Sequence, residues 1–283
     1  MSIKIVLDST TDLLPELKEK FEVVHLTVNF GNEEFIDGVT ITRDEFYSKL
    51  IESDVMPTTS QATPEAFEKV FGKIVENGDE VIAITLASKL SGTYQSACIA
   101  AEEFPGKVKV IDSKSVTIGT TILAEYALSL VESGLSSDVI AEKIEEKRED
   151  VRIVALIDTL EYLKRGGRLS KTAAFAGTLL NIKPVISLVD GEINILGKAR
   201  GSKQGNNFLV KEIEKAGGVD FSLPLLLGYS GHDKYMLEKY VEDSRYIWDG
   251  NVESLRETCI GSVIGTHVGP GAIAVAFFKK TTK

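Results

Sequence analysis

Cysteine and histidine are scarce in this sequence of 283 residues, which contains two cysteines and three histidines. Cys98 and Cys259 lie far apart and form no CxxC pair, so we expect two reduced, buried thiols. The histidines His25, His232 and His267 show neither HExxH nor any other short ligand spacing. The sequence therefore predicts no structural or catalytic metal and no cofactor.

An excess of positive charge and long apolar runs are also missing. The 32 basic and 42 acidic side chains give a formal net charge of -10, and such a field repels polyanions over a Debye length of roughly 8 Å. Nucleic acid is therefore a poor candidate partner. No apolar stretch reaches the roughly 20 residues of a membrane-spanning helix, and the apolar residues 3–7 are too few for a signal peptide. We expect a cytoplasmic protein with at most transient membrane contact.

Several motifs of nucleotide-binding and catalytic proteins are absent as well. The chain contains no GxGxxG for a dinucleotide and no P-loop for a nucleotide phosphate. Ser91 and His267 are both present, which leaves a serine-dependent acyl hydrolase or acyltransferase as an alternative function. Ser91 lies in Leu-Ser-Gly-Thr, however, without the GxSxG turn that exposes a nucleophile above an α/β-hydrolase sheet.

Runs rich in β-branched residues alternate with helical patterns in the first half of the chain. The predicted strands cover residues 3–7, 23–30, 80–86, 107–111 and 152–157. Thr42 with Glu45 forms a capping box, and Thr63 precedes Pro64 at a first helical position. This alternation predicts an α/β fold with a Rossmann-like parallel sheet layered with helices.

The pattern changes after about residue 158. Residues 185–196 predict a hairpin that turns at Asp190-Gly191. A polar helix over 206–216 and apolar strands at 223–228 and 272–278 follow. We expect two domains, an N-terminal α/β domain over 1–155 and a C-terminal α/β domain with a mixed sheet over 156–283.

Three polar clusters follow predicted strands, at the edge where open α/β sheets usually bind ligands. Asp8 to Asp12 also fits a helix N-cap with an acidic first turn, and residues 57–61 also fit a solvated loop. Residues 88–97 place a glycine and hydroxyls at a helix start, which suits an anion, although Ser91 could simply cap that helix. Two such hydroxyl loops could converge on one carboxylate and donate neutral hydrogen bonds, without a full positive charge beside it.

Further candidates lie in the second half. Residues 260–271 place His267 among glycines just before the last strand, and a lone histidine is more often packed or solvated than functional. Arg200 follows the hairpin and is either a surface charge or a partner for phosphate or carboxylate. The basic run of Lys164, Arg165, Arg168 and Lys171 fits a kinase-facing or membrane-facing surface and equally a solvated connection.

Six segments together resemble the DegV family in family order. They are the Asp-Ser-Thr after the first strand, Pro-Thr-Thr-Ser-Gln (57–61), Leu-Ser-Gly-Thr-Tyr-Gln-Ser-Ala (90–97), Leu-Glu-Tyr-Leu-Lys-Arg-Gly-Gly-Arg-Leu (160–169), Lys-Pro (183–184) and Gly-Thr-His-Val-Gly-Pro-Gly-Ala (265–272). One departure is Ala62, where the family often has proline. The resemblance covers essentially the whole chain.

The resemblance implies two α/β domains that bury one long-chain fatty acid in a tunnel. It also implies a partner, because family members resemble the binding subunit of bacterial fatty acid kinase and are not themselves enzymes. A separate ATP-dependent kinase would make the acyl phosphate for phospholipid synthesis. Carried over by position, Thr59, Ser60, Ser91 and His267 would bind the carboxylate. The residues that would support the head group or phosphoryl transfer are Arg200, Thr93 and Thr266.

Overall fold

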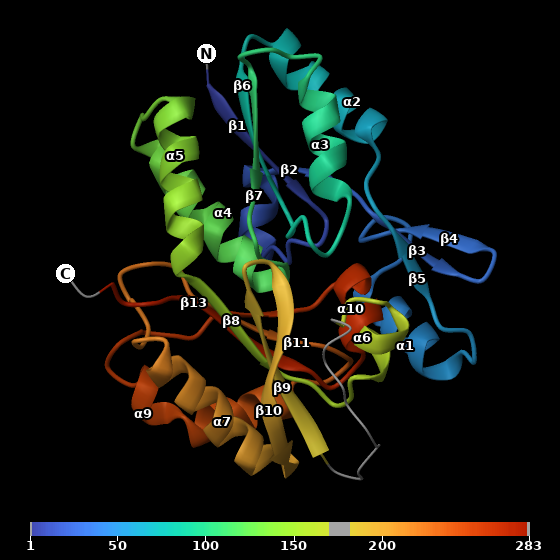
Figure 1. The fold of residues 1–283 in the computed structure, drawn as a ribbon, viewed down its shortest axis with the longest axis vertical. Coiled ribbons are helices and arrows are strands. Elements are labelled where there is room, and N and C mark those ends of the chain that lie inside the picture. Colours follow the sequence, from blue (N-terminus) through green and yellow to red (C-terminus); the bar gives the residue numbers. More distant parts are fainter. Residues whose placement is uncertain (1, 170–181, 282–283) are drawn as a thin grey trace.

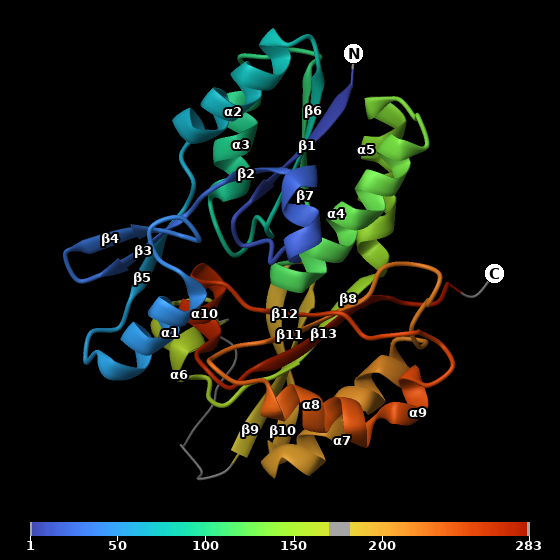
Figure 2. The same ribbon diagram turned by 180° about the vertical axis from the view of Figure 1, so that it is seen from behind.

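The protein contains two large β-sheets and one small one, with helices packed around them (Figure 1). The computed structural model describes residues 2–169 and 182–281. The view from behind shows the parallel sheet stacked above the mixed sheet, with the small antiparallel sheet projecting to one side (Figure 2). The α/β class and the mixed second sheet, both predicted from the sequence, are confirmed.

The parallel sheet belongs to the first half of the chain and has the strand order β2-β1-β6-β7. Its strands are β1 (Ile3–Asp8), β2 (Glu22–Val24), β6 (Glu80–Thr85) and β7 (Val108–Asp112). One face is covered by α2 (Pro64–Glu76) and α3 (Thr93–Ala101), and the other by α4 (Thr117–Glu132) and α5 (Ser137–Lys147). Because both faces are covered, apolar residues of β6 point to both sides of the sheet: Ile82 and Ile84 face α4, whereas Val81 and Ala83 face the opposite side.

One strand predicted from the sequence is divided in the structure. Residues 23–30 were predicted as one strand but form β2 and β3 (Thr27–Phe30) in different sheets. The run is rich in β-branched and apolar residues and contains no glycine or proline, so the contacts of His25 and Leu26 with other segments reveal the break. The strand β3 pairs with β4 (Glu33–Ile36) and β5 (Thr58–Ser60) in the small sheet, and α1 (Arg43–Glu52) lies between those two in sequence.

The mixed sheet has the order β10-β9-β8-β13-β11-β12 and is antiparallel except between β11 and β12. Its strands are β8 (Val151–Leu156), β9 (Ile182–Val189), β10 (Glu192–Arg200), β11 (Leu226–Tyr229), β12 (Glu257–Cys259) and β13 (Ile273–Phe278). The strand β8 contains the predicted boundary at residue 155 and pairs with β9 and β13, so it belongs to this sheet and not to the parallel one.

Helices cover one face of the mixed sheet. They are α7 (Gly201–Lys215), α8 (Tyr235–Asp243) and α9 (Arg245–Trp248). The remaining elements are α6 (Glu161–Arg165), α10 (Ser262–Val268) and the 3-10 turns Pro15–Lys20 and Arg148–Asp150. On the other face α4 packs against both sheets, because Ile118 and Ile122 share one apolar core with Leu7 of β1 and Ala274 of β13. That shared core fixes the two sheets relative to each other.

Local predictions about caps and turns are confirmed. Thr42 and Glu45 form the capping box of α1, and Thr63 accepts a hydrogen bond at the start of α2. The hairpin turns at Asp190 and Gly191, both with positive φ, as a two-residue turn of this type requires. The thiols Cys98 and Cys259 are free but only partly buried. In the described part of the chain, no helix is long and apolar enough to cross a membrane.

Candidate functional site

A cavity of about 370 Å³ lies between the two large sheets. On one side it is bounded by segments that follow the carboxyl ends of the parallel strands, including Leu86 after β6 and Val116 after β7. On the other side it is bounded by the uncovered face of the mixed sheet. This is the edge at which open α/β sheets bind ligands. The two halves of the chain therefore build the cavity jointly.

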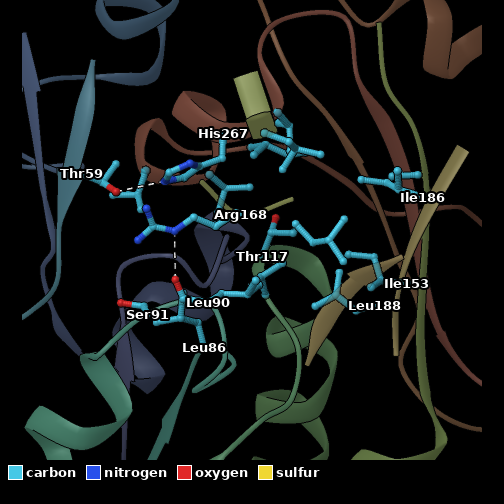
Figure 3. Close-up of a pocket in the computed structure, with 18 of the residues that line it drawn as sticks. Thr59, Leu86, Leu90, Ser91, Thr117, Ile153, Arg168, Ile186, Leu188 and His267 are labelled. Atoms are coloured by element: carbon cyan, nitrogen blue, oxygen red, sulfur yellow. Dashed lines mark hydrogen bonds between the residues drawn. The ribbon is translucent and has the colours of Figure 1, made fainter. Parts of the chain in front are cut away.

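Most of the cavity wall is apolar. Ala274 of β13, Ala155 of β8 and Ile186 of β9 lie side by side across three neighbouring strands and line it. The alternation of a β-strand keeps Ile153 and Leu188 on the same face. In Figure 3 the labels Ile153, Ile186 and Leu188 gather at one end of the cavity, and no charged side chain is labelled beside them.

The opposite end of the cavity is polar (Figure 3). Thr59 of β5, Ser91 before α3 and His267 of α10 all line it, as the sequence comparison with the family implies. The Nε2 atom of His267 lies 3.0 Å from Thr59 Oγ1. These residues are 32 to 208 positions apart in the chain, by subtraction of their numbers. Only the packing of β5, α3 and α10 brings them to the wall of one cavity.

The alternative of a serine hydrolase finds no support in this geometry. Ser91 Oγ lies 2.9 Å from Thr93 Oγ1, and it accepts a hydrogen bond from the Thr93 backbone N–H at 3.3 Å. The imidazole of His267 contacts Thr59 instead. A nucleophilic serine needs the base itself within hydrogen-bond reach. The Ser91 hydroxyl contacts Thr93 and not the imidazole, so this geometry does not provide the base that a nucleophilic serine needs.

Two polar residues of this end were not among the predicted carboxylate-binding residues, although Arg168 belongs to the predicted basic run and Gln61 to the 57–61 segment. Arg168 lines the cavity and donates from Nε to the Leu90 carbonyl at 3.1 Å and from Nη1 to the Gly166 carbonyl at 2.7 Å. The cavity wall therefore includes a full positive charge beside the hydroxyl loops that the sequence pointed to. Gln61 also lines the cavity and donates to Ser96 Oγ at 2.9 Å, which ties the loop of Thr59 to α3. Gln61 lies in the family segment 57–61 and Arg168 in the family segment 160–169, and this was the sequence signal that could have identified them.

The other basic residues near Arg168 behave differently. Arg165 is exposed and pairs with Glu161 one turn earlier, at 2.7 Å. Lys171 lies outside the described residues. Of the described residues in the predicted basic run, only Arg168 lines the cavity.

The remaining predicted site residues lie at varied distances from the cavity wall. Ser60 lines the cavity, and its Oγ accepts from Asn29 at 3.3 Å. Thr93 is buried behind Ser91. Thr266 is buried and donates to the Ser262 carbonyl within α10. Arg200 is exposed at the end of β10, away from the hairpin turn, and is not among the residues that line the cavity.

The imidazole of His267 is neutral at ordinary pH. Its side chain is 9 % exposed. Burial, and secondarily the positive charge of Arg168, lowers its pKa from the usual 6.5 to about 4. Among the described residues that line the polar end, Arg168 is the one fixed cation and the others are neutral.

This neutral imidazole makes the stability of the protein depend on pH. As the pH falls from 6.5 towards 4, the unfolded chain takes up a proton that the folded chain does not, so stability present above pH 6.5 is lost. At pH 5 the loss is roughly 2 kcal/mol, at about 1.36 kcal/mol per pH unit. We expect the difference in unfolding free energy between wild type and His267→Gln to shift by that amount in favour of the variant between pH 7 and pH 5. Urea denaturation at both pH values measures it, and a pH-independent difference would contradict a neutral buried imidazole.

Two buried carboxylates lie behind the cavity wall, and neither caps a helix as proposed from the sequence. Asp8 accepts from the Leu86 N–H at 2.6 Å and from Thr10. Asp12 accepts from Arg43 at 3.0 Å, from Thr117 at 2.5 Å and from the Gly261 N–H at 2.8 Å. Burial raises the pKa of each carboxyl to about 6, against the opposing effect of these hydrogen bonds. Asp12 thus connects α1, the start of α4 and the segment before α10.

Fold and cavity together define a two-sheet α/β protein that encloses an apolar cavity with one polar end. A family model described as an uncharacterised protein of the DegV family matches residues 2–280. This chain belongs to the DegV family. A DegV domain-containing protein of Caldanaerobacter subterraneus subsp. tengcongensis is 37% identical over 283 residues, which cover 98% of this chain and 99% of the relative.

Solved structures of family members match closely. A DegV family protein from Thermus thermophilus, described by its fatty acid binding, has a TM-score of 0.89 and 34% identity over 99% of this chain and 100% of its own. A stearic acid-binding protein from Eubacterium ventriosum has a TM-score of 0.86 and 32% identity over 99% of both chains. These neighbours bind fatty acids.

Proposed function

We propose that this protein binds one long-chain fatty acid in the cavity between its sheets. The acyl chain would lie against Ala155, Ala274 and Ile186. The carboxylate would be bound by Thr59, Ser60 and Ser91, and His267 would help to hold the head group through its contact with Thr59. The observation that carries the proposal is the cavity itself, which is apolar along its length and polar at one end. The fatty acid binding of the neighbours from Thermus thermophilus and Eubacterium ventriosum supports the same ligand class.

The energetics favour this division between tail and head. Burial of about fifteen methylenes at roughly 0.8 kcal/mol each provides a gross driving force near 12 kcal/mol, part of which is lost to the cost of association. A hydrogen bond to a charged group contributes only about 1.5 to 3 kcal/mol. The tail therefore dominates affinity, and the hydroxyls with Arg168 fix the orientation.

We further propose that the protein presents the carboxylate to a separate ATP-dependent kinase and performs no chemistry alone. Arg200, Thr93 and Thr266 are the residues we assign to support of the head group or of phosphoryl transfer. Arg200 is exposed, as a contact with a partner requires. Because the reaction uses ATP and leads to phospholipid synthesis, we place it in the cytoplasm. We expect acyl phosphate to form when the loaded protein is mixed with ATP and the kinase subunit, and hydroxylamine would trap it as the hydroxamate. Acyl phosphate formed without the kinase subunit would contradict this role.

Native mass spectrometry, followed by denaturing extraction and lipid analysis, tests the binding proposal directly. We expect a stoichiometric added mass that matches a free fatty acid. A ligand-free spectrum, with no uptake when fatty acids are added, would refute the proposal.

Removal of the Ser91 hydroxyl should weaken binding only modestly. We expect Ser91→Ala to raise the dissociation constant of a saturated fatty acid by about tenfold, because one hydrogen bond to the carboxylate is lost while the tail contacts remain. Titration of the delipidated protein measures it, with Ser133→Ala at the end of α4 as a control. Complete loss of lipid from a folded variant would contradict the dominance of the tail.

A further inference from the structure

The inner side of the His267 ring is packed against a glycine. While Nε2 contacts Thr59, the Nδ1 atom is buried and has no hydrogen-bond partner among the described residues. A methyl group on Gly166 would stand 2.2 Å from Nδ1 and 2.9 Å from Cε1 of the same ring. A contact below 3.0 Å forces one of the two to move. The imidazole can occupy this position only because residue 166 has no side chain.

The lack of a partner at Nδ1 determines where the ring proton resides. A neutral imidazole carries one N–H, on either Nδ1 or Nε2. Either tautomer leaves Nδ1 without a partner, but a buried N–H without an acceptor is rarer in proteins than an under-satisfied acceptor. The nearby Tyr162 carbonyl already accepts from the Gly166 N–H at 2.8 Å. A proton on Nε2, in contrast, is directed at Thr59 Oγ1.

We propose that Gly166 is a positioning residue that holds His267 as the Nε2–H tautomer, so that His267 donates to Thr59 and leaves the Thr59 proton directed at the ligand. This inference rests on the proposed fatty acid site. A hydroxyl has one proton to donate. If its oxygen already accepts from the imidazole, that proton is available to the carboxylate in the cavity.

The other hydroxyl is oriented in the same way. Ser91 Oγ accepts from the Thr93 backbone N–H, a donor whose direction cannot reverse. Ser91 Oγ also lies 2.9 Å from Thr93 Oγ1, and when the Thr93 hydroxyl is the donor of that hydrogen bond the Ser91 proton is left to point into the cavity. Two hydroxyls that both donate, with Arg168 on the same wall, match an ionised carboxylate. They match an alcohol or ester less well, because such a head accepts weakly. The arrangement therefore selects the free acid.

Gly166 offers a clean substitution. It ends α6 with φ −69° and ψ −8°, a conformation that alanine adopts without strain. The change Gly166→Ala thus acts chiefly through the contact with the imidazole, since the next atom that the methyl meets, the Tyr162 carbonyl oxygen, would lie at 3.1 Å. Gly72, inside α2, is the matched control, because a methyl there meets only the Phe104 ring at an ordinary 3.6 Å.

The test combines two measurements. Long-range proton–nitrogen NMR of the ligand-free wild type at pH 7 should show His267 as the Nε2–H tautomer; the Nδ1–H tautomer would overturn the inference. Binding of stearic acid and of stearyl alcohol is then compared. We expect Gly166→Ala to reduce the preference for the acid by at least about tenfold, the value of one hydrogen bond to a charged group, with alcohol binding unchanged. Gly72→Ala should change neither.

The outcomes separate this inference from the proposed function. Equal weakening of acid and alcohol, or an unchanged preference for the acid, would refute the role of Gly166. If the wild type binds neither compound, the proposed function fails, and the NMR measurement still decides the tautomer.

Discussion

Substitution of Ala155 by leucine is expected to weaken the binding of an eighteen-carbon fatty acid by roughly a hundredfold. Ala155 lies in β8, a central strand of the mixed sheet, yet its side chain is partly exposed because it faces the cavity. Leucine adds three carbons there, which would exclude three to four ligand methylenes at about 0.8 kcal/mol each. Titration of the delipidated variant measures the change.

The same substitution should not destabilise the ligand-free protein. The added side chain fills space that is empty without ligand, so it gains contacts instead of overpacking a closed core. Thermal unfolding of the delipidated protein tests this. Ala141→Leu on α5 makes the same chemical change away from the cavity and should leave binding intact. A twelve-carbon acid should lose less affinity than the eighteen-carbon one. Unchanged binding of the longer acid would place the acyl chain elsewhere.

Removal of the Asp12 carboxylate is expected to reduce the free energy of unfolding by about 1 to 3 kcal/mol for each buried donor that is left without an acceptor. Asp12 is 1 % exposed and accepts from Arg43, Thr117 and the Gly261 N–H. In Asp12→Ala these donors lose their acceptor. The Arg43 side chain is 35% exposed, so water can replace part of its lost hydrogen bonding. Thr117 and Gly261 are buried, so water cannot replace the acceptor that they lose. Urea denaturation at pH 7 measures the loss.

The effect of Asp12→Ala should grow as the pH falls. A carboxyl whose folded pKa is raised from 3.8 to about 6 adds stability to the wild type as it is protonated below pH 6, and that stability is lost as pH rises through 6. The variant lacks this gain. Asp12→Asn, which keeps an acceptor for the Gly261 N–H, should lose less than the alanine variant, and Asp138→Ala at a side chain 86% exposed should lose almost nothing. Equal losses for the two Asp12 variants would contradict the role of that acceptor.

The sequence by itself determined the local and periodic features of this protein. Short apolar runs between helical patterns predicted the strands of the parallel sheet, because both faces of such a sheet are buried. The capping box at Thr42 and the turn at Asp190-Gly191 depend on short-range hydrogen bonding and on φ, which neighbouring residues decide. The family segments pointed to Thr59, Ser91 and His267, all of which line the cavity.

The tertiary structure decided which strands share a sheet and what surrounds the site. Residues 23–30 divide between two sheets although nothing in their sequence breaks the run, because pairing partners lie far away in the chain. Arg168 turns into the cavity while Arg165, three residues earlier, pairs with Glu161 on the surface. The His267 ring lies beside Gly166 only because α6 packs against α10. Contacts between distant segments depend on packing and burial, and a linear sequence without coordinates does not contain them.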